Sequence, residues 1–144
     1  GFGLRKQGMA SALYSRQTDT MNDGAMDWVG GATVRARRVG EVVEVRLGTV
    51  TSQARIYKQT LREFFRTSFD IRPRWGDFEV EIMVDLLPGM PPIDLDNIAK
   101  AVLDGLTKAV FHDDSQIVRL VLEKRRAESE CVMIRAWQRA PAGL

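Results

Sequence analysis

Cysteine, histidine and proline are scarce in this chain of 144 residues, which contains one Cys, one His and five Pro. A single cysteine, Cys131, cannot form a disulfide within the chain, and its apolar surroundings predict a buried thiol without a chemical role. No apolar run approaches the roughly 18 residues that a membrane-spanning helix needs. The N-terminus also lacks the basic, apolar and small-residue order of a signal peptide. We therefore expect a cytoplasmic protein with no membrane partner.

Length and composition predict one compact domain. The chain is 44% hydrophobic and 28% charged, as in ordinary soluble globular proteins, and it is too short for two domains of usual size. Residues 1–30 show neither helical nor strand periodicity and contain three methionines that are possible native starts. We interpret this segment as an N-terminal arm or an added leader, with Trp28 and Val29 as the residues expected to dock. Residues 31–144 form the predicted domain.

The charges are segregated along the chain although the net charge is only +2. Residues 30–75 contain ten Lys or Arg against four acids, and residues 77–114 contain nine acids against two lysines. From residue 115 onward, six basic residues outnumber three acids. A carboxylate-rich segment framed by basic ones is suited to a polyanion and a divalent cation. Solvated charges without a common partner are the alternative.

The first half of the domain shows three periodic segments. Apolar residues alternate over 41–47 and again over 78–87, and this period of two predicts two strands. Between them, residues 54–67 place Ile56, Leu61 and two phenylalanines on one helical face, with basic residues elsewhere. This pattern predicts a basic amphipathic helix.

The second half contains one more helix and two β-rich segments. Asp96 occupies an N-cap position, and apolar residues recur every fourth residue behind it, which predicts a helix from about residue 97 to 110. Residues 117–125 and 131–137 predict two strands joined as a hairpin. The order strand, helix, strand, helix, strand, strand indicates an α/β or α+β fold with one mixed sheet and two main helices packed on it.

Three charged residues meet at the start of the second helix. Asp94 and Asp96 are two residues apart in an extended approach, so their carboxylates project to the same side near the positive end of the helix dipole. Lys100 lies one turn further along the same face, where an ammonium can bind a phosphate oxygen that shares a metal ion. The structural alternative is that Asp96 is only an N-cap and that Lys100 pairs with Asp104.

A second pair of acids, Asp113 and Asp114, follows this helix. If the chain returns to the helix start, one of them could join the first pair around Mg²⁺, which needs only a few carboxylate oxygens plus waters and a phosphate. The alternative is an ordinary turn. We interpret the neighbouring His112 as a loop or packing residue, with a supporting role beside a metal ion as the alternative.

The motif DLDNIAKAVLDGL at residues 94–106, followed by DDSQIV at 113–118 and a downstream Lys124, resembles the signature of the RusA-like Holliday junction resolvases. The similarity is strong over about residues 93–126. The sequence departs from the family pattern ahead of Asp94, where Pro91, Pro92 and Ile93 replace residues that are commonly basic. This departure affects the expected contacts to DNA.

The resemblance implies a homodimeric endodeoxyribonuclease that uses Mg²⁺ or Mn²⁺ to make paired nicks in four-way DNA junctions. It implies that Asp94, Asp96 and Asp114 bind the metal and that Lys100 completes the catalytic set, with Asp113 a weaker candidate. We add candidate DNA contacts from the basic segments: Arg55, Lys58, Arg62, Lys124 and Arg125. A DNA-junction or duplex binding module without cleavage activity is the alternative function.

Overall fold

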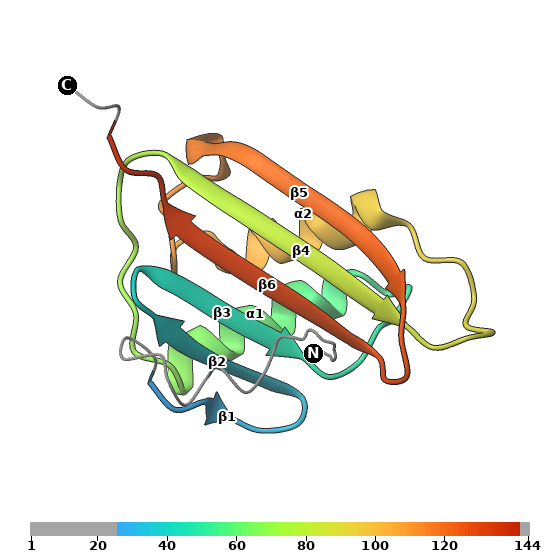
Figure 1. Cartoon of the computed structure of the whole chain (residues 1–144). Coiled ribbons are helices and arrows are strands. Elements are labelled where there is room, and N and C mark those ends of the chain that lie inside the picture. The colour runs from blue at the N-terminus through green and yellow to red at the C-terminus, as the bar shows by residue number, and fades with distance from the viewer. Residues whose placement is uncertain (1–25, 142–144) are drawn as a thin grey trace. The chain divides into compact units, whose positions relative to one another are not determined.

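The computed structural model describes residues 26–141 (Figure 1). Its main unit comprises residues 28–37 and 41–141, while Met26, Asp27 and Arg38–Gly40 belong to a separate unit. The elements are, in chain order, β1 (Val29–Gly30), β2 (Val34–Val39), β3 (Val42–Leu47), α1 (Arg55–Thr67), β4 (Phe78–Leu86), α2 (Leu95–Leu106), a 3-10 turn (Asp114–Gln116), β5 (Ile117–Arg126) and β6 (Cys131–Gln138). The predicted mixed sheet with two main helices is confirmed.

The six strands form one mixed sheet in the order β1-β2-β3-β6-β4-β5. Strand β6 is antiparallel to both of its neighbours, with Val45 opposite Ile134 and Ile82 opposite Ile134. Strand β5 is parallel to β4. The predicted hairpin of the last two strands is therefore wrong, because β4 lies between β5 and β6. Strands β1 and β2 were not predicted, although Val29 does join the sheet as expected.

Both helices pack on the same face of the sheet, and the core fills the space between the two layers (Figure 1). Alternate residues of β4, from Phe78 to Val84, are buried beneath the helices. Leu61 on α1 and Val102 on α2 are fully buried against them. Burial of each such side chain contributes about 1.5–3 kcal/mol. The two helices are thus fixed to the sheet along their apolar faces.

The bounds of α2 differ from the sequence prediction at both ends. Asp94, and not Asp96, is the N-cap, because the Asp94 carboxylate accepts a hydrogen bond from the Asp96 amide at 3.0 Å. The helix ends at Leu106, four residues early, since Thr107 is extended and Lys108 has a positive φ of 76°. This early end leaves a longer connection to β5.

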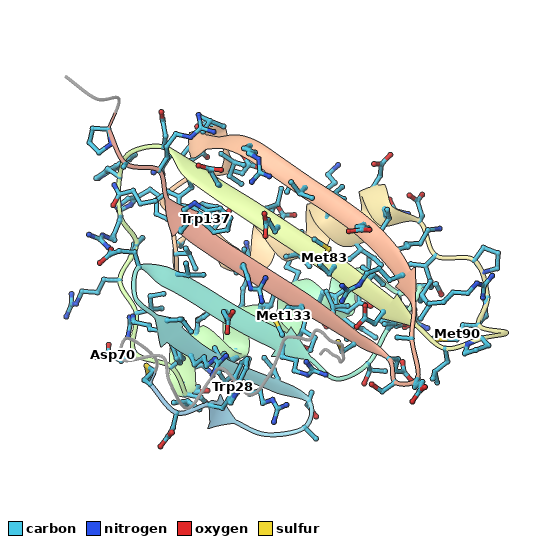
Figure 2. All side chains as sticks on the ribbon, in the orientation of Figure 1. Trp28, Asp70, Met83, Met90, Met133 and Trp137 are labelled. Atoms are coloured by element: carbon cyan, nitrogen blue, oxygen red, sulfur yellow. The ribbon has the colours of Figure 1, made fainter. Side chains whose placement is uncertain are left out.

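The sheet face opposite the helices carries Met83, Met133 and Trp137 (Figure 2) together with a set of ion pairs. The pairs are Arg37–Glu44, Arg135–Glu44, Arg119–Glu79, Arg119–Glu81, Arg125–Asp85 and Arg139–Glu79.

Cys131 is only 2% exposed, and burial raises the pKa of its thiol to about 11. The thiol is therefore protonated at neutral pH and unreactive, as its sequence context predicts. None of the described helices has the length and apolar character needed to cross a membrane.

Candidate active site

Asp94 and Asp96 lie together at the first turn of α2, and both side chains are exposed. One oxygen of Asp94 accepts the Asp96 amide, so the local geometry of the helix start depends on this carboxylate. The positive end of the helix dipole stabilises both negative charges. The remaining carboxylate oxygens face solvent. Asp94 is therefore an N-cap whose side chain is exposed, so the capping interpretation and the metal-binding hypothesis are compatible.

Lys100 lies one turn beyond Asp96 on α2 and is exposed. Within residues 26–141 its ammonium makes no ion pair. Asp104, the partner expected under the structural alternative, instead lies 4.0 Å from Lys58 of α1. This arrangement leaves the Lys100 ammonium available to an incoming anion.

Lys124 on β5 reaches the same end of α2. Its ammonium donates a hydrogen bond to the Ile93 carbonyl at 3.0 Å. Ile93 is itself buried and directly precedes Asp94. A residue expected to contact DNA thus anchors the segment that leads into the carboxylate pair. Asp94, Asp96, Lys100 and Lys124 together are called the α2-start cluster below.

Asp113 and Asp114 have different roles beyond the other end of α2. Asp113 caps the 3-10 turn, accepting the Ser115 amide at 2.9 Å, and hydrogen bonds from Ser115 hold the pKa of this carboxyl below its usual range. Asp114 is exposed and lines a shallow pocket with Leu103 and residues 117–120. Asp114 is therefore the better placed of the two to bind a ligand.

Gln116 fixes the surroundings of Asp114. Its carbonyl oxygen accepts the amides of His112 and Asp113 at 2.8 and 3.0 Å. Its amide group donates to the carbonyls of Arg74 and Gly76 at 3.0 and 2.8 Å. One side chain therefore joins two loops that are about 40 residues apart in the chain. This link between the two loops was not predicted from the sequence.

The ring of Trp75 stacks on His112, with the ring centroids 4.0 Å apart and the planes inclined by 13°. The expectation that His112 packs in a loop is confirmed. Trp75, His112 and Asp114 are called the α2-end cluster below. Sequence reasoning missed Trp75, because the only local signal is a tryptophan within the polar segment RPRWGD.

The two clusters lie at opposite ends of α2. Asp114 lines a pocket with Leu103, which lies nine residues beyond Asp94 and so about 14 Å further along α2. Consistently, no three His, Cys, Asp or Glu side chains of residues 26–141 are grouped as a metal site. The donor chemistry suits a hard cation, because the accessible groups are carboxylates. The number of carboxylates at either end of α2 falls short of the expected set of three.

The candidate DNA contacts lie on two different faces. Arg55 and Arg62 are exposed on α1, and Lys58 lies between them toward Asp104. Arg125 aligns with Asp85 of β4 and pairs with it at 2.9 Å, on the sheet face opposite the helices. The α1 residues share the helix side of the sheet with the α2-start cluster, whereas Arg125 does not.

The fold and these clusters define a small α+β protein with acidic and basic groups arranged around one helix. A profile of the family described as Endodeoxyribonuclease RusA matches residues 49–136, which is more than half of the chain. The chain therefore belongs to the RusA endodeoxyribonuclease family, as its motifs indicate. Membership implies an endonuclease that acts on Holliday junctions. The matched range includes α1, both clusters of α2 and strands β4 and β5. No curated protein matches the chain.

Proposed function

We propose that this protein is a homodimeric, Mg²⁺-dependent endonuclease that makes paired nicks in four-way DNA junctions. The single observation that carries this proposal is the exposed Asp94–Asp96 pair with Lys100 one turn away, whose ammonium makes no ion pair among the described residues, in a chain of the RusA family. Mn²⁺ could replace Mg²⁺, because both accept carboxylate oxygens.

A second copy of the chain would supply the missing acid. Asp94 and Leu103, the α2 residue that shares a pocket with Asp114, are about 14 Å apart along the helix. In a two-fold symmetric dimer, a contact of one surface with another occurs twice. If the α2-start cluster of one copy meets Asp114 of the other, two equivalent sites form. Two sites are what paired cuts in a symmetric junction require.

Each residue of the proposed site has a definite task. Asp94, Asp96 and the second copy's Asp114 would hold the metal ion, which polarises the phosphate and lowers the pKa of a bound water. The Lys100 ammonium would stabilise the charge that develops on the phosphodiester during attack. Arg55, Lys58 and Arg62 of α1 would bind the phosphates of a junction arm.

A mixing experiment tests the shared site. Asp96→Asn and Asp114→Asn are prepared as separate pure proteins, and each is expected to be inactive on a synthetic four-way junction with Mg²⁺. Mixing and re-equilibrating the two should restore nicking, because half of the mixed dimers' sites contain all three acids. The mixture should make single nicks and few paired ones. EDTA in place of Mg²⁺ is the negative control.

The outcomes separate the candidate functions. Mixing that restores nothing, with both variants dimeric and folded, would exclude a site shared between chains. Junction binding by the parent protein without nicking under any divalent cation would favour the non-catalytic binding module. Failure to bind junction DNA at all would exclude both functions.

A further inference from the structure

Trp75 is the most exposed of the large apolar side chains in the described part of the chain, with 68% of its surface accessible. Its ring stacks on His112 at 4.0 Å, and a stack of this kind covers one ring face. The high exposure means that the other face is open to solvent. Contact of this ring with a ligand would remove its apolar surface from water.

The backbone that carries Trp75 is held from several sides. The Arg74 amide donates to the Val110 carbonyl at 3.1 Å, and the Gln138 amide group donates to the Trp75 carbonyl. Gln116 binds the carbonyls on both sides of Trp75. Gly76 has a φ of 99°, and a Cβ there would lie 2.6 Å from Gln138 Nε2, so the turn requires glycine. The tryptophan ring is therefore presented by a rigid loop.

The Gln116 side chain also connects the loop of Trp75 to the segment that carries Asp114, a residue of the proposed metal site. Gln116, which holds Arg74 and Gly76, also holds the amides of His112 and Asp113, directly before Asp114. The open ring face thus belongs to the α2-end cluster. Arg72 and Lys108 are exposed on the two loops and supply positive charge for phosphates, while Arg74 pairs with Glu41 at 3.1 Å.

We propose that Trp75 is a stacking platform for an unpaired nucleobase of the branched DNA substrate. The flat open ring, the fixed loop and the adjacent basic residues match the features by which proteins bind unstacked bases, since every base has a π-face. A protein partner is the alternative occupant, since Trp and Arg are also enriched at protein interfaces, and the oligomeric state measured below distinguishes it from DNA. The inference rests on the proposed function and adds a base-binding site to it.

The test measures binding of full-length protein in EDTA, where no cleavage occurs, to two probes. One is a four-way junction with 2-aminopurine at the branch point, and the other is a fully paired duplex of equal length. Trp75→Ala should weaken junction affinity about 5- to 100-fold and leave duplex affinity unchanged. The change in 2-aminopurine fluorescence on binding should be lost with it.

Two further variants at the same position separate stacking from apolar contact. Trp75→Phe keeps a flat ring and should retain much of the junction affinity. Trp75→Leu keeps apolar bulk without a ring and should behave like Trp75→Ala. Because the side chain is exposed, all three variants should keep the parental midpoint of urea unfolding.

Equal junction affinity for the parent and Trp75→Ala would contradict the proposed stacking role of Trp75. Equal junction affinities for the Phe and Leu variants would contradict it as well. A change in oligomeric state with unchanged DNA affinity would assign Trp75 to a protein interface and overturn it as well. These results leave nicking by the parent protein intact, so they are distinct from failure of the proposed function. Conversely, a parent that binds junctions through Trp75 without nicking would contradict only the proposed cleavage.

Discussion

At the residue scale, Lys124 shows how one hydrogen bond changes an interpretation. Its position in the sequence, at the end of a basic strand, predicts a phosphate contact. In the structure, its ammonium donates to the carbonyl of Ile93, one residue before Asp94. An ammonium has three donors, so this bond does not by itself exclude a contact with DNA. The bond does connect Lys124 to the backbone that positions the carboxylate pair.

We therefore predict that Lys124→Met lowers the single-turnover rate of junction nicking more than it lowers junction affinity. Loss of the ammonium leaves the Ile93 carbonyl without this donor and loosens the approach to Asp94, and small displacements of catalytic groups reduce rates strongly. The measurement is the rate at saturating protein, together with the salt dependence of binding. A salt slope smaller by about 0.9, with an unchanged rate, would instead identify Lys124 as a phosphate contact.

At the scale of single elements, the sequence predicts those features that local patterns decide. Alternation over residues 78–87 predicts β4 (Phe78–Leu86) with nearly correct bounds, because one face of that strand is buried. The predicted start of α2 is two residues too late, because both Asp94 and Asp96 are good N-cap residues and only the observed hydrogen bond distinguishes them. The motif placed all acids of the candidate site in a short segment, but the length of α2 separates them.

Pairings between distant segments could not be read from the sequence. Strand β6 lies between β3 and β4, although the short charged turn before Cys131 favours a local hairpin with β5. Sheet order depends on which strands bury their apolar faces together, and this is a property of the whole core. The Trp75–His112 stack has the same origin, because Gln116 joins two loops that no local pattern relates.

The contact between α1 and α2 gives a prediction at this scale. Gly105 of α2 faces Leu61 of α1 so closely that a Cβ would lie 2.8 Å from Leu61 Cβ. Alanine is the better helix former by about 1 kcal/mol, but overpacking costs about 1–3 kcal/mol. We expect Gly105→Ala to lower the free energy of unfolding by up to about 2 kcal/mol in urea titrations.

The matched control is the same substitution in a Leu61→Gly background, which removes Leu61 Cβ, Cγ and Cδ1, the atoms that Gly105 approaches. There the space opposite residue 105 is open, so Gly105→Ala should stabilise the protein through helix propensity. The same loss of stability in both backgrounds would show that close approach of the two helices is not the reason for glycine at this position.

At the scale of the whole molecule, the fold separates two kinds of basic residue. On the sheet face opposite the helices, arginines are paired with acids, as in Arg125–Asp85 and Arg139–Glu79. On the outer side of α1, Arg55 and Arg62 are exposed, and they share the helix side of the sheet with the proposed catalytic groups. The net charge of +2 conceals this difference. A polyanion should therefore bind to the helix side.

We predict that Arg55→Gln with Arg62→Gln reduces the magnitude of the salt slope of junction binding by about 1.8, because each phosphate contact releases about 0.9 counterion. Binding is measured by titration in EDTA at several monovalent salt concentrations. The control is Arg125→Gln with Arg139→Gln, which removes the same charge from the opposite face and should leave the slope unchanged. Similar slopes for the two double variants would mean that DNA responds only to total charge. A reduced slope for the control alone would place the DNA on the face opposite the helices, away from Asp94, Asp96 and Lys100.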